Sequence, residues 1–161
     1  MKVRLPLDPD LRNASGSVST RALSPGFDRI TSSVLTQAIG IGALDPVTAE
    51  LIRWRNARRQ DCQVCQGYRD ESARVAGVTD ATLAKVDDYE SSDLPEAHKA
   101  VLRFVDAYLG NPETVPDDVI AGMQLHFTPL QRAEVVLRLH GTTQNRVMRA
   151  LGLDQGPAPT P

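Results

Sequence analysis

Residues 45–54 read DPVTAELIRW, and this stretch decides the fold class. Asp45 is a residue type favoured at the N-cap of a helix, and Pro46 suits the first helical position, where its missing N–H is not needed. The apolar residues that follow recur at helical spacing, at Val47, Leu51 and Trp54. The stretch therefore predicts a helix that begins at Pro46 and runs to about Gln60.

Similar start signals recur along the rest of the chain. An earlier helical pattern covers 27–39, and a helix that carries both cysteines is expected from about Asp61 to Gly77. Further helices are expected to begin near Thr79, Pro95, Pro116 and Thr128. The β-branched alternation typical of strands is absent apart from a trace near the N-terminus. The prediction is an all-α protein.

The two ends of the chain differ in composition from its middle. Residues 1–26 mix proline and glycine with small polar residues and are predicted to form an irregular N-terminal arm. Residues 154–161, rich in proline, are predicted to be a disordered tail. The intervening 27–153 is long enough to bury the core of one helical domain.

Composition narrows the class of protein. A formal net charge of −2 gives no reason to expect nucleic acid or an anionic membrane as a partner, although arginines cluster shortly before the cysteines. No run approaches the roughly 20 apolar residues of a membrane span, and the first residues lack the apolar core of a secretory signal. A cytoplasmic location is therefore expected. Because that compartment is reducing, the two cysteines are not expected to form a structural disulfide framework.

Cys62 and Cys65 are the first candidates for chemistry. Three residues apart on a helix, they share a face, and Asp61 as N-cap would place both thiols in the first turn. Unpaired backbone N–H groups there stabilise a thiolate, which a second thiol can convert to a disulfide after oxidation. This redox interpretation ranks ahead of two buried, inert cysteines and well ahead of a metal site, because the three histidines lack ligand spacing. No metal or cofactor is predicted.

Glu50 and Arg69 are two further candidates. Glu50 falls on the apolar stripe of its predicted helix, where a carboxylate needs a partner; a surface pair with Arg53 is the simplest explanation. Arg69 lies four residues after Cys65, and a permanent cation there would favour the thiolate. A side chain extending into solvent is the simplest explanation of Arg69 taken alone.

Together these features resemble the alkylhydroperoxidase D-like (AhpD-like) branch of the carboxymuconolactone decarboxylase family. Redox members of that branch have a glutamate, eleven residues, and then a Cys-x-x-Cys-x-x-x-His motif. Glu50, Cys62 and Cys65 match this motif, and Arg69 stands where the motif has histidine. The likeness covers roughly residues 30–152. It implies a bundle of about six to seven antiparallel helices and a homo-oligomer, commonly a trimer or hexamer.

The resemblance also implies roles for the site residues. Cys65 would attack the peroxide, Cys62 would be the proton donor and resolving thiol, and Glu50 would belong to the relay that deprotonates Cys65. Arg69 cannot act as a base, because a guanidinium stays protonated at any working pH. It would instead hold the thiolate electrostatically or form an ion pair with Glu50.

The leading interpretation is a thiol-dependent peroxidase or disulfide oxidoreductase with an antioxidant role. Its partners would be a small-molecule hydroperoxide and a dithiol reductant. One alternative is a non-catalytic or redox-sensing oligomeric helical module. Another is a decarboxylase-like enzyme that binds a small organic acid through arginines near its pocket.

Overall fold

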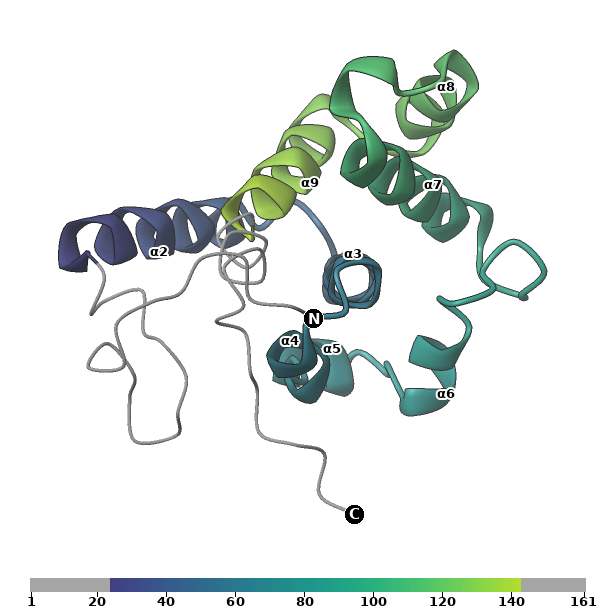
Figure 1. The fold of residues 1–161 in the computed structure, drawn as a ribbon. Helices are drawn as coiled ribbons and strands as arrows, with labels where there is room; N and C mark the ends of the chain where they lie inside the picture. Colours follow the sequence, from purple (N-terminus) through teal and green to yellow (C-terminus); the bar gives the residue numbers. More distant parts are fainter. Residues whose placement is uncertain (1–23, 143–161) are drawn as a thin grey trace.

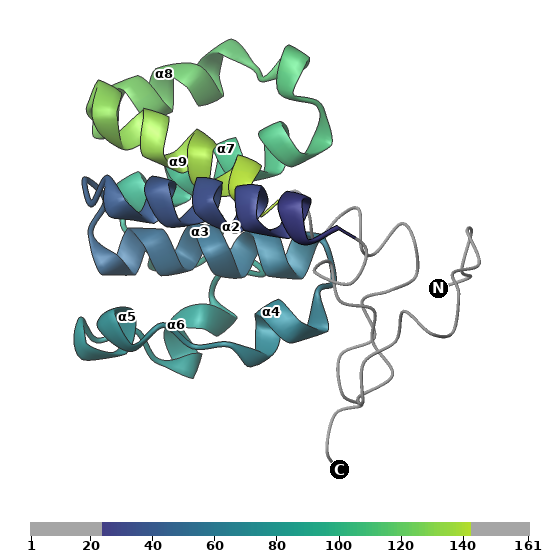
Figure 2. The ribbon, with the colours of Figure 1, turned by 90° about the vertical axis from the view of Figure 1, so that its left-hand side faces the viewer.

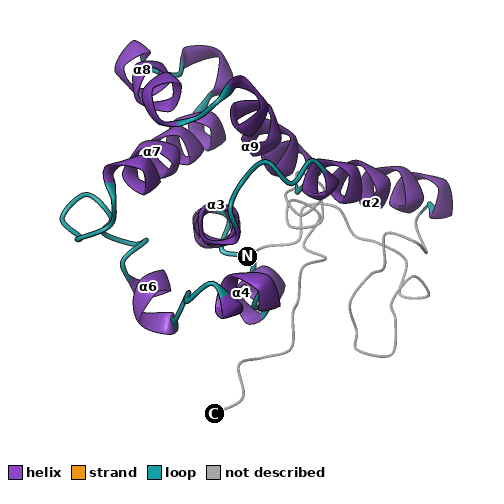
Figure 3. Ribbon diagram, turned by 180° about the vertical axis from the view of Figure 1, so that it is seen from behind, coloured by secondary structure: helices purple, strands orange, loops and turns teal. Residues whose placement is uncertain are grey.

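The computed structural model describes residues 24–142, and within that range every regular element is helical (Figures 1 and 3). In chain order the elements are α2 (Pro25–Gly40), α3 (Pro46–Arg59), α4 (Gln63–Gly67), α5 (Glu71–Val75), α6 (Asp80–Ala84), α7 (Glu96–Gly110), the 3-10 helix η2 (Pro112–Thr114), α8 (Asp117–His126) and α9 (Pro129–Gly141). The all-α prediction is confirmed. The predicted tail, nearly all of the predicted arm, and the extension of the last helix toward Leu151 lie outside the described residues.

Several helices, α3 and α9 among them, begin where local capping signals predicted. The Asp45 carboxylate accepts a hydrogen bond from the Thr48 backbone N–H at 2.9 Å, and Pro46 is the first residue of α3. Thr128 and Gln131 form a reciprocal capping box at the start of α9. Each cap satisfies backbone N–H groups that the first turn leaves without an intrahelical partner. The residues that determine each helix start therefore lie within a few positions of it.

α3 is the central helix. Figure 1 shows it nearly end-on, with α7 and α9 on one side and α4 and α5 on the other. Because α3 is covered on several sides, buried residues lie on more than one of its faces and include polar ones: Thr48, Glu50, Leu51, Ile52, Asn56 and Ala57. The hydrophobic core extends from α3 into α7 through fully buried residues such as Val101, Leu102 and Val105. Figure 2 shows the short helices α4, α5 and α6 gathered on one side of α3.

The single helix expected from Asp61 to Gly77 is not formed, and this is a correction. Asp61 adopts a positive φ of 49°, so it is not the N-cap; Cys62 takes that position instead. α4 then ends, and the chain is extended until Asp70, whose carboxylate accepts the Ala73 N–H at 3.1 Å and caps the new helix α5. A short polar side chain that binds nearby backbone competes with helix continuation, and here it divides the predicted helix in two.

α2 and α9 pack unusually closely at one point. A Cβ added to Gly141 would lie 3.1 Å from three atoms of Leu35, closer than ordinary van der Waals contact, so that Leu35 would have to shift by a few tenths of an ångström. The absence of a side chain at Gly141 therefore lets the two helices approach. Since Leu35 also borders the candidate site described below, this contact positions one of its walls.

A polar cluster joins α3 to α7. Arg55 donates to both carboxylate oxygens of Asp106, at 2.8 and 2.7 Å, and the Tyr89 hydroxyl donates to the same carboxylate at 2.9 Å. The Arg55 guanidinium also lies 5.1 Å from the centre of the Tyr89 ring. Burial and the Asp106 carboxylate raise the pKa of Tyr89 to about 12. The cluster satisfies polar groups that would otherwise be buried without partners.

Among the described helices, none has both the length and the apolar character that crossing a membrane requires.

Candidate functional site

Cys62 and Cys65 are joined by a disulfide at the start of α4, with their Cα atoms 5.3 Å apart. Cys62 is the N-cap, and its Sγ accepts a hydrogen bond from the Cys65 backbone N–H at 3.3 Å. The two cysteines differ in exposure: Cys62 is only 4% exposed, whereas Cys65 is half-buried and borders a pocket. A reagent in that pocket therefore meets Cys65 first.

Glu50 is buried on α3, only 3% exposed, whereas a pair with Arg53 at the surface was the simplest expectation. Its partner is Arg53, one turn along the same helix, whose Nε and Nη2 atoms donate to the two carboxylate oxygens at 2.6 Å each. The pair suggested by the sequence is thus formed, but it lies inside the protein and not at the surface. Burial without such a partner would be strongly unfavourable for the carboxylate.

Arg53 also connects Glu50 to the cysteine turn. Its Nη1 donates to the Cys65 carbonyl oxygen at 2.5 Å, and its Nη2 donates to the Tyr68 carbonyl oxygen at 3.0 Å. The guanidinium lies 5.3 Å from the centre of the Tyr68 ring. Sequence reasoning considered Arg53 only as a surface partner of Glu50; the spacing of three residues signals the ion pair but not the contact across to α4.

Arg69 does not share a helix face with Cys65, although its spacing predicted that it would. It belongs to the extended segment between α4 and α5, where a four-residue separation no longer means a shared helix face. Its guanidinium lies 4.6 Å from the centre of the Trp54 ring and 3.3 Å from the Asp80 carboxylate, and its side chain is 43% exposed. Within residues 24–142 its other hydrogen bonds go to backbone carbonyls.

The alternative role predicted for Arg69, an ion pair with Glu50, is also not found. Arg53 occupies both Glu50 oxygens, and Arg69 pairs with Asp80 instead. The cation that links the glutamate to the cysteine turn is therefore Arg53, which comes from the same helix as Glu50.

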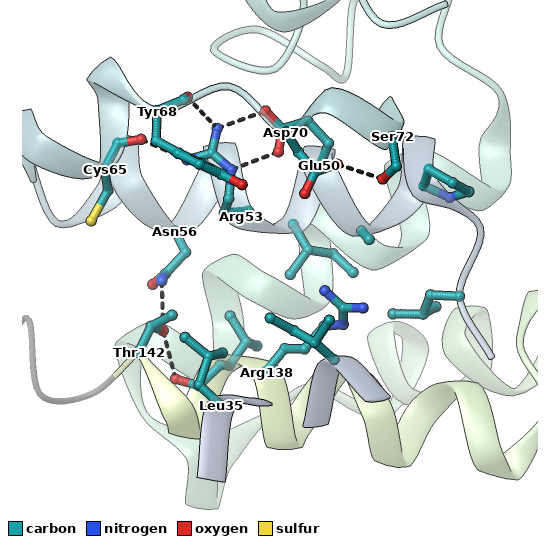
Figure 4. A pocket seen from close by; sticks show the side chains of 16 residues that line it. Leu35, Glu50, Arg53, Asn56, Cys65, Tyr68, Asp70, Ser72, Arg138 and Thr142 are labelled. Atoms are coloured by element: carbon teal, nitrogen blue, oxygen red, sulfur yellow. Dashed lines mark hydrogen bonds and ion pairs between the residues drawn. The ribbon is translucent and has the colours of Figure 1, made fainter. Parts of the chain in front are cut away.

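A pocket of about 640 Å³ lies between these groups and helices α2 and α9 (Figure 4). Cys65, Glu50 and Arg53 border it from one side. Much of the remaining lining is apolar: Leu35, Ile39, Leu44, Ile52 and Leu139. Concave, mostly apolar sites with a few polar groups are typical of small-molecule binding.

A second buried carboxylate lies behind the opposite wall. Glu134 on α9 is fully buried, and one of its oxygens accepts the backbone N–H groups of Ala43 and Leu44 at 2.7 and 3.1 Å. Its other oxygen pairs with Arg138, which borders the pocket, at 2.7 Å. Sequence reasoning missed Arg138; its four-residue spacing from Glu134 was the available signal.

Asp70 borders the pocket near Arg53. Hydrogen bonds from the Ser72 hydroxyl and from the Ala73 N–H outweigh desolvation and lower the pKa of this carboxyl. Asp70 is therefore ionised at neutral pH. With Glu50, it places two carboxylates beside the single cation Arg53 at this side of the pocket.

In the part of the chain that the structure describes, no group of three or more histidine, cysteine or acidic side chains is arranged to hold a metal ion.

No protein-family model matches the chain. Two curated Mycobacterium tuberculosis proteins are each 33% identical to it over 113 residues: Uncharacterized protein Rv2313c of strain H37Rv and Uncharacterized protein MT2376 of strain CDC 1551. The match covers 70% of this chain, and the chain spans about 40% of the length of these relatives.

A solved Agrobacterium tumefaciens structure is similar in three dimensions. The protein, ATU0492, is described there as having unknown function, with the antioxidant defence protein AhpD as its suggested identity. It superposes with a TM-score of 0.76 and 19% identity, covering 89% of this chain and 99% of that one. At this identity the likeness concerns the fold. The chain therefore has the AhpD-like helical fold that its sequence resemblance implied.

Proposed function

We propose that this chain is a member of the AhpD-like branch and a thiol-dependent peroxidase or disulfide oxidoreductase. The observation that carries the proposal is the position of the Cys62–Cys65 pair: the two sulfurs are close enough to bond, and Cys65 borders a pocket large enough for an organic hydroperoxide. A pair of this kind supports reversible oxidation, since one sulfur reacts and the other resolves it.

The proposed reaction starts from the reduced pair. The Cys65 thiolate attacks the terminal oxygen of the hydroperoxide; the O–O bond breaks, the alcohol leaves with a proton, and Cys65 becomes a sulfenic acid. The Cys62 thiolate then attacks that sulfur, the S–S bond forms, and the hydroxyl leaves with a proton as water. Two thiols lose two electrons and two protons, and the hydroperoxide becomes alcohol and water.

A dithiol reductant would restore the reduced pair. Attack on the accessible Cys65 sulfur would release Cys62 as the leaving thiolate, and the Cys65 N–H that already bonds to the Cys62 sulfur would stabilise this charge. Access thus favours Cys65 as the residue that meets the hydroperoxide and the reductant, while the hydrogen bond to the Cys62 sulfur favours Cys62 as the leaving thiolate during reduction.

The test is single-turnover oxidation of the reduced protein by cumene hydroperoxide. We expect the wild type to lose both thiols and form one intramolecular disulfide, Cys62→Ser to stop at a Cys65 sulfenic acid that dimedone traps, and Cys65→Ser to lose reactivity. Equal hydroperoxide consumption by wild type and Cys65→Ser would refute the proposal.

A second candidate function is a redox-sensing module without rapid peroxide turnover. The observation that favours it is the geometry of Glu50, whose two oxygens are both held by Arg53, so that acting as a relay base would require breaking one of these bonds. A sensor would form the disulfide slowly with hydroperoxide and exchange readily with dithiols, which the same experiment distinguishes.

A homo-oligomer, as the resemblance implies, is part of the proposal. Large apolar side chains are exposed on α8 and α9, among them Leu125 at 78% and Leu130 at 57%. Contact with further copies would remove them from water. Sedimentation of the purified chain measures the number of copies directly.

A further inference from the structure

Arg138 presents part of its guanidinium to the pocket. Its Nε and Nη2 atoms face Glu134 behind the wall, both 2.7 Å from the same carboxylate oxygen. Within residues 24–142 its Nη1 group has no hydrogen-bond partner, and the side chain retains 20% exposure. Glu134, held by two backbone N–H groups, fixes the orientation of the guanidinium without covering its pocket side.

The other arginine that borders the pocket is fully engaged by protein groups. All three nitrogens of Arg53 donate to Glu50, to Cys65 or to Tyr68. Among the lining residues in the described range, Arg138 is thus the cation with donors left for a ligand. A guanidinium with a fixed orientation is suited to a carboxylate, which accepts charge-assisted hydrogen bonds from it.

The charges around the pocket differ between its two sides, which favours one orientation of a charged ligand. Glu50 and Asp70 lie with Arg53 on the side of the cysteine turn, so this side carries two carboxylates and one cation. Figure 4 shows Cys65 on that wall and the Arg138 guanidinium rising from the opposite wall. The opposite side carries the cation of Arg138 and the carboxylate of Glu134, so its charges balance. A ligand carboxylate is therefore repelled at the first side, whereas at the second it meets a partly exposed guanidinium and no net negative charge. The apolar lining between them suits a hydrocarbon body.

We propose that the pocket binds amphipathic carboxylic acids, with the carboxylate on Arg138 and the apolar body extending toward Cys65. Together with the proposed peroxidase function, on which this step rests, the substrate class is then the hydroperoxides of such acids. The hydroperoxide group at the far end of the molecule reaches Cys65, and its reduction to alcohol and water follows the two-thiol reaction given above.

The test separates binding from turnover by using a ligand that cannot react. Octanoate and octanamide have the same length and differ in charge, and their dissociation constants are measured by calorimetry on the oxidised wild-type protein. We expect octanoate to bind about tenfold more tightly than octanamide, because one charge-assisted contact is gained. Arg138→Gln should reduce this ratio to near one, while Arg132→Gln, on the same helix but outside the pocket lining, should keep it.

The wild-type comparison stands even if Arg138→Gln does not fold. Equal affinity for the two ligands, or a preference for octanoate that survives in folded Arg138→Gln, overturns the proposal. A preference that depends on Arg138 supports the carboxylate site even if no hydroperoxide is turned over, in which case the peroxidase function alone fails. Conversely, fast turnover of cumene hydroperoxide with no octanoate preference upholds the peroxidase and rejects the subsite.

Discussion

Arg53 holds both carboxylate oxygens of Glu50, with nitrogen–oxygen distances of 2.6 Å, on the side of the pocket that carries the disulfide. The same guanidinium donates to the Cys65 carbonyl oxygen, so one side chain fixes the buried glutamate and the cysteine turn together. The Glu50–Arg53 ion pair therefore serves both the folding of α3 and the placement of Cys65.

Loss of Arg53 should destabilise the protein strongly. In Arg53→Gln the Glu50 carboxylate stays buried without its cation, and we expect the free energy of unfolding to fall by about 3 kcal/mol. Urea denaturation measures the change. Arg74→Gln is the matched control, because Arg74 forms the same three-residue pair with Glu71 but at a fully exposed site, where no measurable loss is expected. Equal losses in the two variants would contradict the argument.

Arg69→His should not improve peroxide reactivity. Because Arg69 lies in the extended segment and contacts Trp54 and Asp80, an imidazole at this position would not face the Cys65 sulfur along a helix. We expect the single-turnover rate of disulfide formation to change by less than about twofold, which is under about 0.5 kcal/mol of barrier. A severalfold acceleration in stopped-flow measurements would show that residue 69 reaches the thiols.

The two thiols of the reduced protein should differ in their reaction with alkylating agents. Cys65 is half-buried and borders the pocket, whereas Cys62 is 4% exposed. Iodoacetamide should therefore modify Cys65 first, by about tenfold or more in rate. Mass spectrometry of peptides from a time course gives the order, and prior modification of Cys62 would reverse the roles assigned to the two sulfurs.

Stability should fall at high pH through Tyr89. Its pKa is raised to about 12 in the folded protein, against about 10 in an unfolded chain, so the folded state holds this proton more tightly. The stabilisation is complete below pH of about 10 and is lost as the pH rises toward about 12. Urea unfolding across this range should show a steeper loss for wild type than for Tyr89→Phe, in which this titration is absent. Parallel curves would assign the loss to other groups.

Gly141→Ala should loosen the packing of α2 on α9. The added Cβ would lie 3.1 Å from atoms of Leu35, and forcing the helices apart should cost about 1–3 kcal/mol of unfolding free energy. Gly110→Ala is the control: Gly110 also ends a helix, but a Cβ there meets nothing within 4 Å. If thermal unfolding shows both variants to be as stable as wild type, α2 is free to shift on α9.

The helices and the cysteine pair could be predicted from the sequence because their signals are local. Asp45 with Pro46, and Thr128 with Pro129, mark the starts of α3 and α9 within one turn of backbone, and the spacing of Cys62 and Cys65 brings the two sulfurs within bonding distance. The helical period also placed Glu50 on the apolar stripe of α3, but a surface pair with Arg53 was the simplest expectation, and the structure buries that pair.

The contacts that complete the site were decided only by the tertiary structure. Arg69 does not share a helix face with Cys65 because the helix ends before it, and Asp70 caps the start of a new helix. Arg138 faces the pocket because Glu134 is held by the backbone of residues 43 and 44, some 90 positions away in the chain. Contacts of this kind depend on how the helices pack. The sequence around Glu134 carries no signal that residues 43 and 44 will bind it. The sequence by itself therefore determined most of the helix starts and the spacing of the cysteine pair, whereas packing decided where the helix after Cys62 breaks and which charges surround the pair.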